Sequence, residues 1–396
     1  PINSTAGGIV GSGDGNILNC VNEGVVEAND EDKMGNASAG GIIGCISGYN
    51  VSSCTNKGSV TCTGGNAGGI AGTAYVMDSR FPVRINDCVN EGMVSAPDYY
   101  YAGIVGNAYV DATDGELTIS GCTNQQDFTE GEGAGILHHA ALSDGGTMIL
   151  ADDVNHGSIS TEGQDAAGIL AYVTNMGANW NRTVERCVNT GTISSSLHAG
   201  GIVCFTYFPA TQDQNTTFTV TDCENSGNLS TSKINGYMGG IVAVDGLMLT
   251  QTQITGCRNT GDITFEGILT VGKDEKETVE NKNAFTLSVT GGGIVGRVGQ
   301  SLLLSIDADK LDKSMIGLED ALVTISDCES TGNLTAQNPE KGDGVSEEYK
   351  EKYADVLWQS NLGGILGDCS CTEGYSVKIE NCTHNAENEI GNPELQ

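Results

Sequence analysis

Short apolar runs flanked by glycine recur along the whole chain. Each run begins with isoleucine, followed by a second residue that is nearly always aliphatic, as in Gly40-Gly41-Ile42-Ile43-Gly44. The copies lie about 33 residues apart until two longer intervals near the C-terminus, and they centre on Ile9, Ile42, Ile70, Ile104, Ile136, Ile169, Ile202, Ile241, Ile294 and Ile365. Self-similarity at this period indicates a repeat architecture.

A second phrase follows each copy of the first. Its anchor is a cysteine in every copy but one, and the anchors are Cys20, Cys54, Cys88, Cys122, Asp153, Cys187, Cys223, Cys257, Cys328 and Cys382. An aliphatic residue lies three positions before each anchor, and most copies have Asn two positions after it, Gly four after it and an apolar residue six after it. The unit therefore reads G-G-I-V-G, a variable stretch, and then I-x-x-C-x-N-x-G-x-V.

These apolar runs predict β-strands. They are short, rich in Ile and Val and bounded by Gly or Asn, and some alternate with period two, as in Phe218-x-Val220. A unit with three such strands cannot bury its apolar face alone, so successive units must stack. We therefore expect an all-β fold over residues 1–396, a single domain built as a right-handed, three-faced parallel β-helix (β-solenoid) of about ten coils.

Stacking in register gives each constant position a role. Cysteine is small and readily buried, so its column belongs in the interior. Asparagine is expected at a turn, where it adopts left-handed backbone and hydrogen-bonds to its equivalents above and below. The glycine that follows allows the backbone to reverse closely. Insertions at about 265–289, 297–322 and 335–361 interrupt the repeat, and the last of them predicts one short helix capped by Ser346.

Cysteine is frequent, with 14 residues, but its pattern does not favour a disulfide framework. In-register Cβ atoms on neighbouring coils lie nearly 5 Å apart, whereas a disulfide needs about 3.8 Å. No C-x-x-C pair suggests zinc. We expect free, buried thiols, with metal binding or scattered bridges as the alternatives.

Charge narrows the possible partners. Lys and Arg total 18 against 51 Asp and Glu, a formal net charge of −33 that repels phosphate backbones and anionic lipid. We therefore expect no nucleic-acid partner and no membrane contact. Acidic loops such as 29–32 offer oxygen ligands but lack the spacing of known calcium loops. No cofactor is expected, and a structural calcium is the alternative.

The repeat resembles the GLUG motif of bacterial cell-surface proteins. The resemblance is carried by Gly40-Gly41-Ile42-Ile43-Gly44 followed by Val51-x-x-Cys54-x-Asn56-x-Gly58-x-Val60, and it covers nearly the whole chain except the insertions. It implies an extracellular, surface-attached fragment of a larger bacterial protein, of the kind found in adhesins and beside secreted peptidase domains. No catalytic residue belongs to the motif.

Enzymatic alternatives remain open. β-Helices that degrade polysaccharides need clustered carboxylates and a basic residue on neighbouring coils. The sequence identifies no such set, and we interpret His138-His139 and Asp152-Asp153 as parts of solvated loops. A polysaccharide-degrading lyase or glycoside hydrolase and an accessory segment of a secreted peptidase are the alternatives to a non-catalytic module.

Aromatic residues are scarce, so their grouping is informative. Candidate ligand-binding residues are Tyr99, Tyr100, Trp180 and Tyr207, which could present flat faces to a sugar ring or a peptide, and ordinary packing beneath loops is the favoured alternative. Tyr75 and Tyr109 occupy equivalent positions and are expected to stack. The resemblance to GLUG-motif proteins implies a non-catalytic adhesin-like or spacer module on the bacterial surface, and we expect a host or microbial glycan or protein as its partner.

Overall fold

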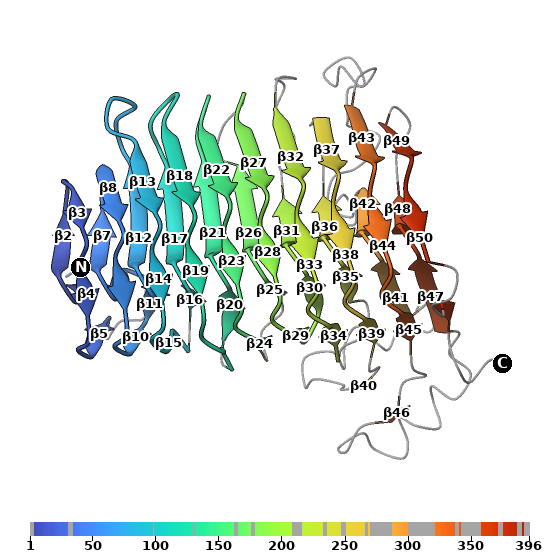
Figure 1. Cartoon of the computed structure of the whole chain (residues 1–396), viewed down its shortest axis with the longest axis horizontal. Coiled ribbons are helices and arrows are strands. Elements are labelled where there is room, and N and C mark those ends of the chain that lie inside the picture. Colours follow the sequence, from blue (N-terminus) through green and yellow to red (C-terminus); the bar gives the residue numbers. More distant parts are fainter. Residues whose placement is uncertain are drawn as a thin grey trace, which may run out of the picture.

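The computed structural model shows a parallel β-solenoid. It describes residues 4–30, 35–97, 99–129, 131–161, 165–175, 179–207, 216–232, 236–246, 251–265, 268–269, 287–299, 321–336, 340–341, 358–370, 375–385 and 390–391. Four sheets contain ten strands each, one from every copy of the repeat. Figure 1 shows the windings following one another along the longest axis, from β2–β5 at one end to β47–β50 at the other. The all-β solenoid is confirmed, and its right-handed coil stays a prediction.

Two of the ten-stranded sheets are built around the glycine pair. Sheet A precedes it and contains β1 Thr5–Gly7, β6 Ala37–Gly40, β11 Gly65–Gly68, β16 Tyr100–Ala102, β20 Glu132–Ala134, β25 Asp165–Ala167, β30 His198–Gly200, β35 Tyr237–Gly239, β41 Leu287–Gly292 and β47 Trp358–Gly363. Sheet B follows it and contains β2 Val10–Gly13, β7 Ile43–Ile46, β12 Ala71–Val76, β17 Val105–Val110, β21 Leu137–Leu142, β26 Leu170–Asn175, β31 Val203–Tyr207, β36 Val242–Gly246, β42 Val295–Gly299 and β48 Leu366–Ser370.

The other two flank the cysteine anchor. Sheet C contains β3 Ile17–Leu18, β8 Tyr49–Ser52, β13 Val83–Asn86, β18 Glu116–Ser120, β22 Thr147–Ala151, β27 Asn181–Glu185, β32 Thr217–Thr221, β37 Gln251–Thr255, β43 Ala321–Ser326 and β49 Tyr375–Glu380. Sheet D contains β4 Val21–Asn22, β9 Thr55–Asn56, β14 Val89–Asn90, β19 Thr123–Asn124, β23 Val154–Asn155, β28 Val188–Asn189, β33 Glu224–Asn225, β38 Arg258–Asn259, β44 Glu329–Ser330 and β50 Thr383–His384.

Shorter sheets complete the windings. Sheet E contains β5 Val26–Asn29, β10 Val60–Thr63 and β15 Val94–Ser95, and sheet F contains β24 Ile159–Ser160, β29 Ile193–Ser195, β34 Leu229–Thr231, β39 Ile263–Phe265, β45 Leu334–Ala336 and β51 Ile390–Gly391. Within the predicted insertions, β40 Ile268–Leu269 pairs in parallel with β46 Glu340–Lys341. The helix predicted within 335–361, with Ser346 as its cap, lies outside the described residues.

Most windings have five strand positions where the sequence analysis expects three, because two bends divide the expected strands. The glycine pair separates sheet A from sheet B. The second bend is the residue directly before the anchor, which has φ between 51° and 65° in all copies: Asn19, Ser53, Asp87, Gly121, Asp152, Arg186, Asp222, Gly256, Asp327 and Asn381. Asn, Asp and Gly, which tolerate this left-handed region best, dominate the column.

The prediction of a left-handed asparagine two residues after the anchor was therefore wrong. Those asparagines lie in sheet D and are buried. The predicted bonding between equivalents is confirmed, since each side-chain amide donates from Nδ2 to Oδ1 of the next at 2.7–3.0 Å, through Asn22, Asn56, Asn90, Asn124, Asn155, Asn189, Asn225 and Asn259. We call this column the asparagine ladder.

The second glycine of each pair lies against this ladder. A Cβ on Gly41 would lie 2.3 Å from Cγ of Asn56 and 2.2 Å from the carbonyl oxygen of Gly69 in the next winding. The glycine four residues after the anchor also touches backbone, since a Cβ on Gly58 would lie 1.8 Å from the oxygen of Gly24. The glycines of both phrases are therefore required by close contact between windings.

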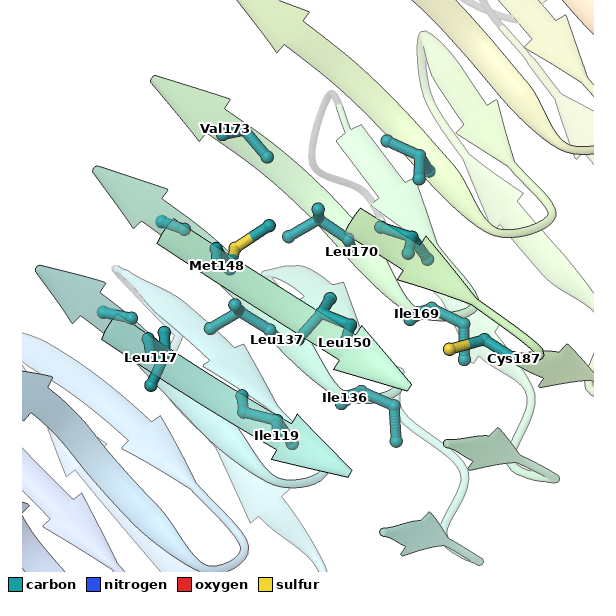
Figure 2. Packing of buried hydrophobic residues seen from close by; sticks show 14 of the residues in the cluster. Leu117, Ile119, Ile136, Leu137, Met148, Leu150, Ile169, Leu170, Val173 and Cys187 are labelled. Atoms are coloured by element: carbon teal, nitrogen blue, oxygen red, sulfur yellow. The ribbon is translucent and has the colours of Figure 1, made fainter. Parts of the chain in front are cut away.

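Aliphatic columns fill the interior. Figure 2 shows Leu117, Ile119, Ile136 and Leu137 pointing into the space between strands, and Met148 and Leu150 repeat Leu117 and Ile119 one winding further along. A second apolar cluster joins sheet A to sheets E and F, with residues such as Val60 and Ala67. Stacked columns of this kind bury a continuous core that no single winding could form.

Thiols form the predicted interior column. The anchors from Cys54 to Cys328 are buried, and all anchor cysteines are free. Cys54 Sγ donates to the carbonyl oxygens of Ser52 at 3.3 Å and of Ile17 at 3.6 Å. The expectation of free, buried thiols is confirmed for the buried anchors, while Cys371 lies outside the described residues.

Asp153 replaces a thiol in this column and is completely buried, which corrects its interpretation as part of a solvated loop. Its Oδ1 accepts a hydrogen bond from the backbone N–H of Cys122 at 2.8 Å, and its Oδ2 has no hydrogen-bond partner. Burial raises the pKa of this carboxyl well above its usual value. The protonated, neutral form is thus the one that the fold favours.

Replacing Asp153 with the cysteine of the other windings is expected to stabilise the protein. The unfolded carboxyl loses its proton near pH 4 and the folded one only at higher pH, so the wild type loses stability as pH rises through this interval. Asp153→Cys should raise the free energy of unfolding by about 2 kcal/mol at pH 7 and by less at pH 4. Urea unfolding at both pH values measures this, and an advantage independent of pH would contradict it.

Candidate functional site

Two outward columns meet where sheets A and B join. The position of sheet A that lies four residues before each central isoleucine carries Thr5, Ser38, Asn66, Tyr100, Glu132, Asp165, His198, Tyr237, Thr290 and Asn361. The facing position of sheet B carries Ser12, Cys45, Thr73, Asn107, His139, Tyr172, Phe205, Val244, Arg297 and Asp368. The N-terminal windings have small polar residues here, joined for example by the Ser38 Oγ to Thr73 Oγ1 hydrogen bond of 2.8 Å.

Larger side chains that carry rings or charges replace these small residues further along. We call the following half-buried set the corner row: Tyr100, Glu132, Asp165, His198 and Tyr237 from sheet A, and His139, Tyr172, Phe205, Arg297 and Asp368 from sheet B. The outward column of sheet D, by contrast, has mostly Thr and Val, as at Thr55, Val89 and Thr123. Aromatic, imidazole and acidic groups therefore gather on one corner of the solenoid.

The rings of the corner row stack along the solenoid axis. The ring centroids of Tyr172 and Phe205 are 5.4 Å apart and the two rings lie at an interplanar angle of 12°. The centroids of His198 and Tyr237 are 5.1 Å apart, with an interplanar angle of 10°. His139 lies 5.5 Å from Tyr172 in a tilted arrangement. Because these ring faces turn toward one another, their edges and polar groups are what remains for a ligand.

A second aromatic pair flanks the row. Tyr75 and Tyr109 stack at 4.9 Å and 11°, which confirms the prediction made from their equivalent positions. Asn107 donates from Nδ2 to the Tyr109 hydroxyl at 3.0 Å. Burial raises the pKa of Tyr75 to about 12, so this phenol stays protonated at neutral pH.

Polar contacts join consecutive windings within the row. His198 Nδ1 lies 2.6 Å from Asp165 Oδ1, with 12% and 18% of the two side chains exposed. Further along, Arg297 donates from Nη1 to the Tyr237 hydroxyl, and its Nε lies 3.6 Å from Asp368 Oδ2. The row is thus acidic near Glu132 and Asp165 and carries its guanidinium several windings away.

His138 and His139 belong to strand β21, so their interpretation as part of a solvated loop was wrong. His138 is buried and neither of its ring nitrogens has a hydrogen-bond partner, and its ring stacks on Tyr100 at 4.5 Å. His139 is held at 3.0 Å from Asn107 Oδ1 and 2.9 Å from Thr174 Oγ1. Burial lowers the pKa of His138 to about 3 and that of His139 to about 4, so both are neutral at pH 7.

His138 is expected to make the protein acid-labile. The unfolded imidazole binds a proton near pH 6.5 and the folded one only near pH 3, so stability is lost as pH falls between these values. The equivalent residue in the next winding is Ala171, so alanine fits this position. Between pH 7 and pH 4, the free energy of unfolding of His138→Ala should fall by about 3 kcal/mol less than that of the wild type. Thermal unfolding against pH tests this, with the exposed His156→Ala as control. An unchanged acid loss in His138→Ala would contradict the assignment.

The four sequence candidates have different outcomes. Tyr100 lies in the corner row. The ring of Tyr99 lies edge-on to the ring of Tyr100, with the two centroids 6.4 Å apart. Trp180 is fully buried, with the guanidinium carbon of Arg182 over its ring at 3.7 Å, so it is unsuited to contact a ligand and is withdrawn. Tyr207 ends strand β31, and its side chain lies outside what the structure describes.

Most of the corner row was missed from sequence, although a signal existed. Aligning the ten copies shows the position four residues before each central isoleucine changing from Ser and Asn to Tyr, Glu, Asp and His. Tyrosine and tryptophan alone guided the prediction of ligand-binding residues, whereas Glu132, Asp165 and His198 carry other side chains. Residues that meet across windings are about 33 positions apart and form no local cluster.

Among the described residues, no three His, Cys, Asp or Glu side chains are grouped to hold a metal ion. Of the acidic loop 29–32, Asp30 accepts a hydrogen bond from the backbone N–H of Asn36 at 3.2 Å, and Glu31 and Asp32 lie outside the described residues. The described part of the chain contains no helix that is both long and apolar enough to span a membrane.

Comparisons with protein-family models, curated proteins and solved structures found no match to this chain.

Proposed function

We propose that the chain is a non-catalytic module of a bacterial cell-surface protein, adhesin-like or serving as a spacer, and that it binds a host or microbial glycan or protein through the corner row. The resemblance of its repeat to the GLUG motif supports an extracellular location. One observation carries the binding role, namely that aromatic, imidazole and acidic side chains replace small polar ones over consecutive windings at a single corner.

The rest of the repeat supplies a rigid support for such a surface. The asparagine ladder, the thiol column and the glycine contacts fix each winding against the next, so side chains about 33 residues apart keep a constant spacing. Binding groups held on regular strands lose little conformational freedom on binding. A stacked corner therefore suits an elongated ligand that contacts several windings at once.

Binding arrays of glycans and host proteins test this role. Tyr172→Thr and Phe205→Thr introduce the residue that the same column has at Thr73, and each should weaken binding of any retained ligand at least tenfold. Thr183→Ala, on the outward face of sheet C, is the control and should bind as the wild type does. Equal binding by all variants would remove the corner row from the proposal, and failure of every ligand to bind wild type would contradict the binding role.

A polysaccharide-degrading enzyme is the second candidate. It is favoured by Glu132 and Asp165 on neighbouring strands with the His198 imidazole hydrogen-bonded to Asp165. A net charge of −33 disfavours polyuronates as its substrates, because they are polyanions. Release of reducing ends from neutral polysaccharides, lost in Glu132→Gln, would support this candidate over the first.

A further inference from the structure

Strand edges are open at both ends of the solenoid. Strands β1 to β4 begin their sheets and β47 to β50 end theirs, so among the described strands each has a neighbour on one side only. The inward columns reach the surface at these ends. Ile9 is 43% exposed and Ile379 is 46% exposed, whereas the equivalent Ile42 and Ile325 are completely buried. The two ends lie at opposite limits of the longest axis (Figure 1).

The central isoleucines show which hydrogen-bonding groups each edge presents. Within the solenoid, the N–H of one central isoleucine donates to the carbonyl oxygen of the next, as Ile9 does to Ile42 at 3.0 Å and Ile294 does to Ile365 at 3.1 Å. Among the described residues, no winding precedes the Ile9 oxygen and none follows the Ile365 N–H. The first winding therefore presents an acceptor at this position and the last winding presents a donor.

The anchors repeat this match in the opposite direction. The N–H that follows an anchor donates to the carbonyl oxygen of the anchor one winding earlier, as Thr55 does to Cys20 at 2.9 Å. At the two ends, the equivalent groups are the Val21 N–H of the first winding and the Cys382 oxygen of the last. The edges are therefore complementary, and unpaired groups of this kind are a template for pairing with another chain.

Side chains at the two edges are compatible as well. Stacking in register would continue the inward columns by placing Ile365 on Ile9, Ile379 on Ile17 and Cys382 on Cys20. In the outward columns it would place Asn361 beside Thr5, Asp368 beside Ser12 and Lys378 beside Asn16. None of these pairs brings together two charges of the same sign.

We propose that this chain associates end to end with a second copy of itself, the last winding of one copy stacking on the first winding of the next. The inference goes beyond the proposed function, because it does not involve the corner row or its ligand. A second copy is the partner that fits, since it presents donors, acceptors and apolar columns at the spacing of the repeat. Such a head-to-tail contact leaves one edge free at each end and can extend into a fibre.

The direction of the contact follows from the parallel pairing. Every pairing between described strands is parallel and in register, including β1 with β6 at one end and β41 with β47 at the other. A last winding placed on a first winding repeats this arrangement. Two first windings placed face to face would run their strands antiparallel and would not continue the columns.

Analytical ultracentrifugation over a range of protein concentrations tests the association. The sedimentation coefficient of the wild type should rise with concentration, and more strongly at high salt, because the net charge of −33 makes the copies repel one another. Ile9→Glu and Ile379→Glu each place a carboxylate in the contact, and each should weaken self-association at least tenfold. Met93→Glu adds the same charge at a side chain that is 63% exposed within the third winding, and it should associate as the wild type does.

Mixing the two end variants shows which edges meet. Ile9→Glu keeps an unaltered last winding and Ile379→Glu an unaltered first winding, so the mixture should form a heterodimer and grow no further. The heterodimer would also show that both variants fold. A wild type that stays monomeric at every concentration and salt overturns the proposal, and so does association weakened equally by Met93→Glu. Dimers of Ile379→Glu alone, with none formed on mixing, would show that two first windings meet and would overturn the head-to-tail contact.

Discussion

Replacing Asn124 with alanine should lower the free energy of unfolding by about 4 kcal/mol. The Asn124 side chain donates to Asn155 Oδ1 and to the Gln126 carbonyl oxygen, both at 2.9 Å, and accepts from Asn90 Nδ2 at 3.0 Å. Alanine removes these three bonds and the 3.4 Å bond that Asn124 Oδ1 accepts from the Gln126 N–H, and it leaves one N–H of the Asn90 amide and the Oδ1 of Asn155 without these partners. Each such buried group costs about 1–3 kcal/mol.

The neighbouring Thr123→Ala is the matched control for this change. Thr123 lies on the same short strand but faces outward. The substitution should therefore change the free energy of unfolding by no more than about 0.5 kcal/mol. Denaturant unfolding followed by circular dichroism measures both variants, and hydrogen exchange locates the loss among the windings. Equal stability of the two variants would mean that the asparagine ladder contributes nothing to the fold.

Replacing Gly135 with alanine should be more damaging still. A Cβ there would lie 2.0 Å from the carbonyl oxygen of Gly168 and 2.4 Å from Cγ of Asn155. Both contacts are far shorter than atoms allow, and the first is with backbone of the next winding. The windings must separate locally to make room, so we expect a loss above about 4 kcal/mol, or failure to fold.

Gly13→Ala is the comparison for this variant. A Cβ on Gly13 would meet its nearest neighbour, Val10 Cγ1, at 4.0 Å, which is ordinary contact. This substitution should change the melting temperature by a few degrees at most. If Gly135→Ala melted as Gly13→Ala does, the close contact between windings at the glycine directly before each central isoleucine would be wrong.

The interior was predictable because identical windings impose identical surroundings. Ile42, Cys54 and Gly41 each stack on an equivalent residue, so their chemistry repeats and is visible in one sequence. The left-handed bend was missed for a physical reason. Asn suits both a left-handed backbone and a buried hydrogen-bonded ladder, and the sequence analysis assigned the asparagine column, at Asn56 and its equivalents, to the wrong one of these roles.

The candidate site was harder to predict because outward positions are free to vary. Tyr100 was identified, but His198 and Asp165 become partners only when windings 33 residues apart are placed in register. Buried polar residues such as Arg182, whose Nη2 donates to the Thr174 carbonyl oxygen at 2.8 Å, depend on a single winding and break the pattern of the repeat. Trp180 looked like a surface ring because its place under that guanidinium has no equivalent elsewhere.

The side-chain amides of Asn90 and Asn124 provide the most direct test of stacking in register. In deuterated protein with protonated amides, a nuclear Overhauser effect should connect the Asn90 and Asn124 side-chain amide protons, and another should connect those of Asn124 and Asn155, with slow exchange at all three. Missing cross-peaks between these amides together with exchange at the rate of exposed asparagine would show that the windings do not stack as described.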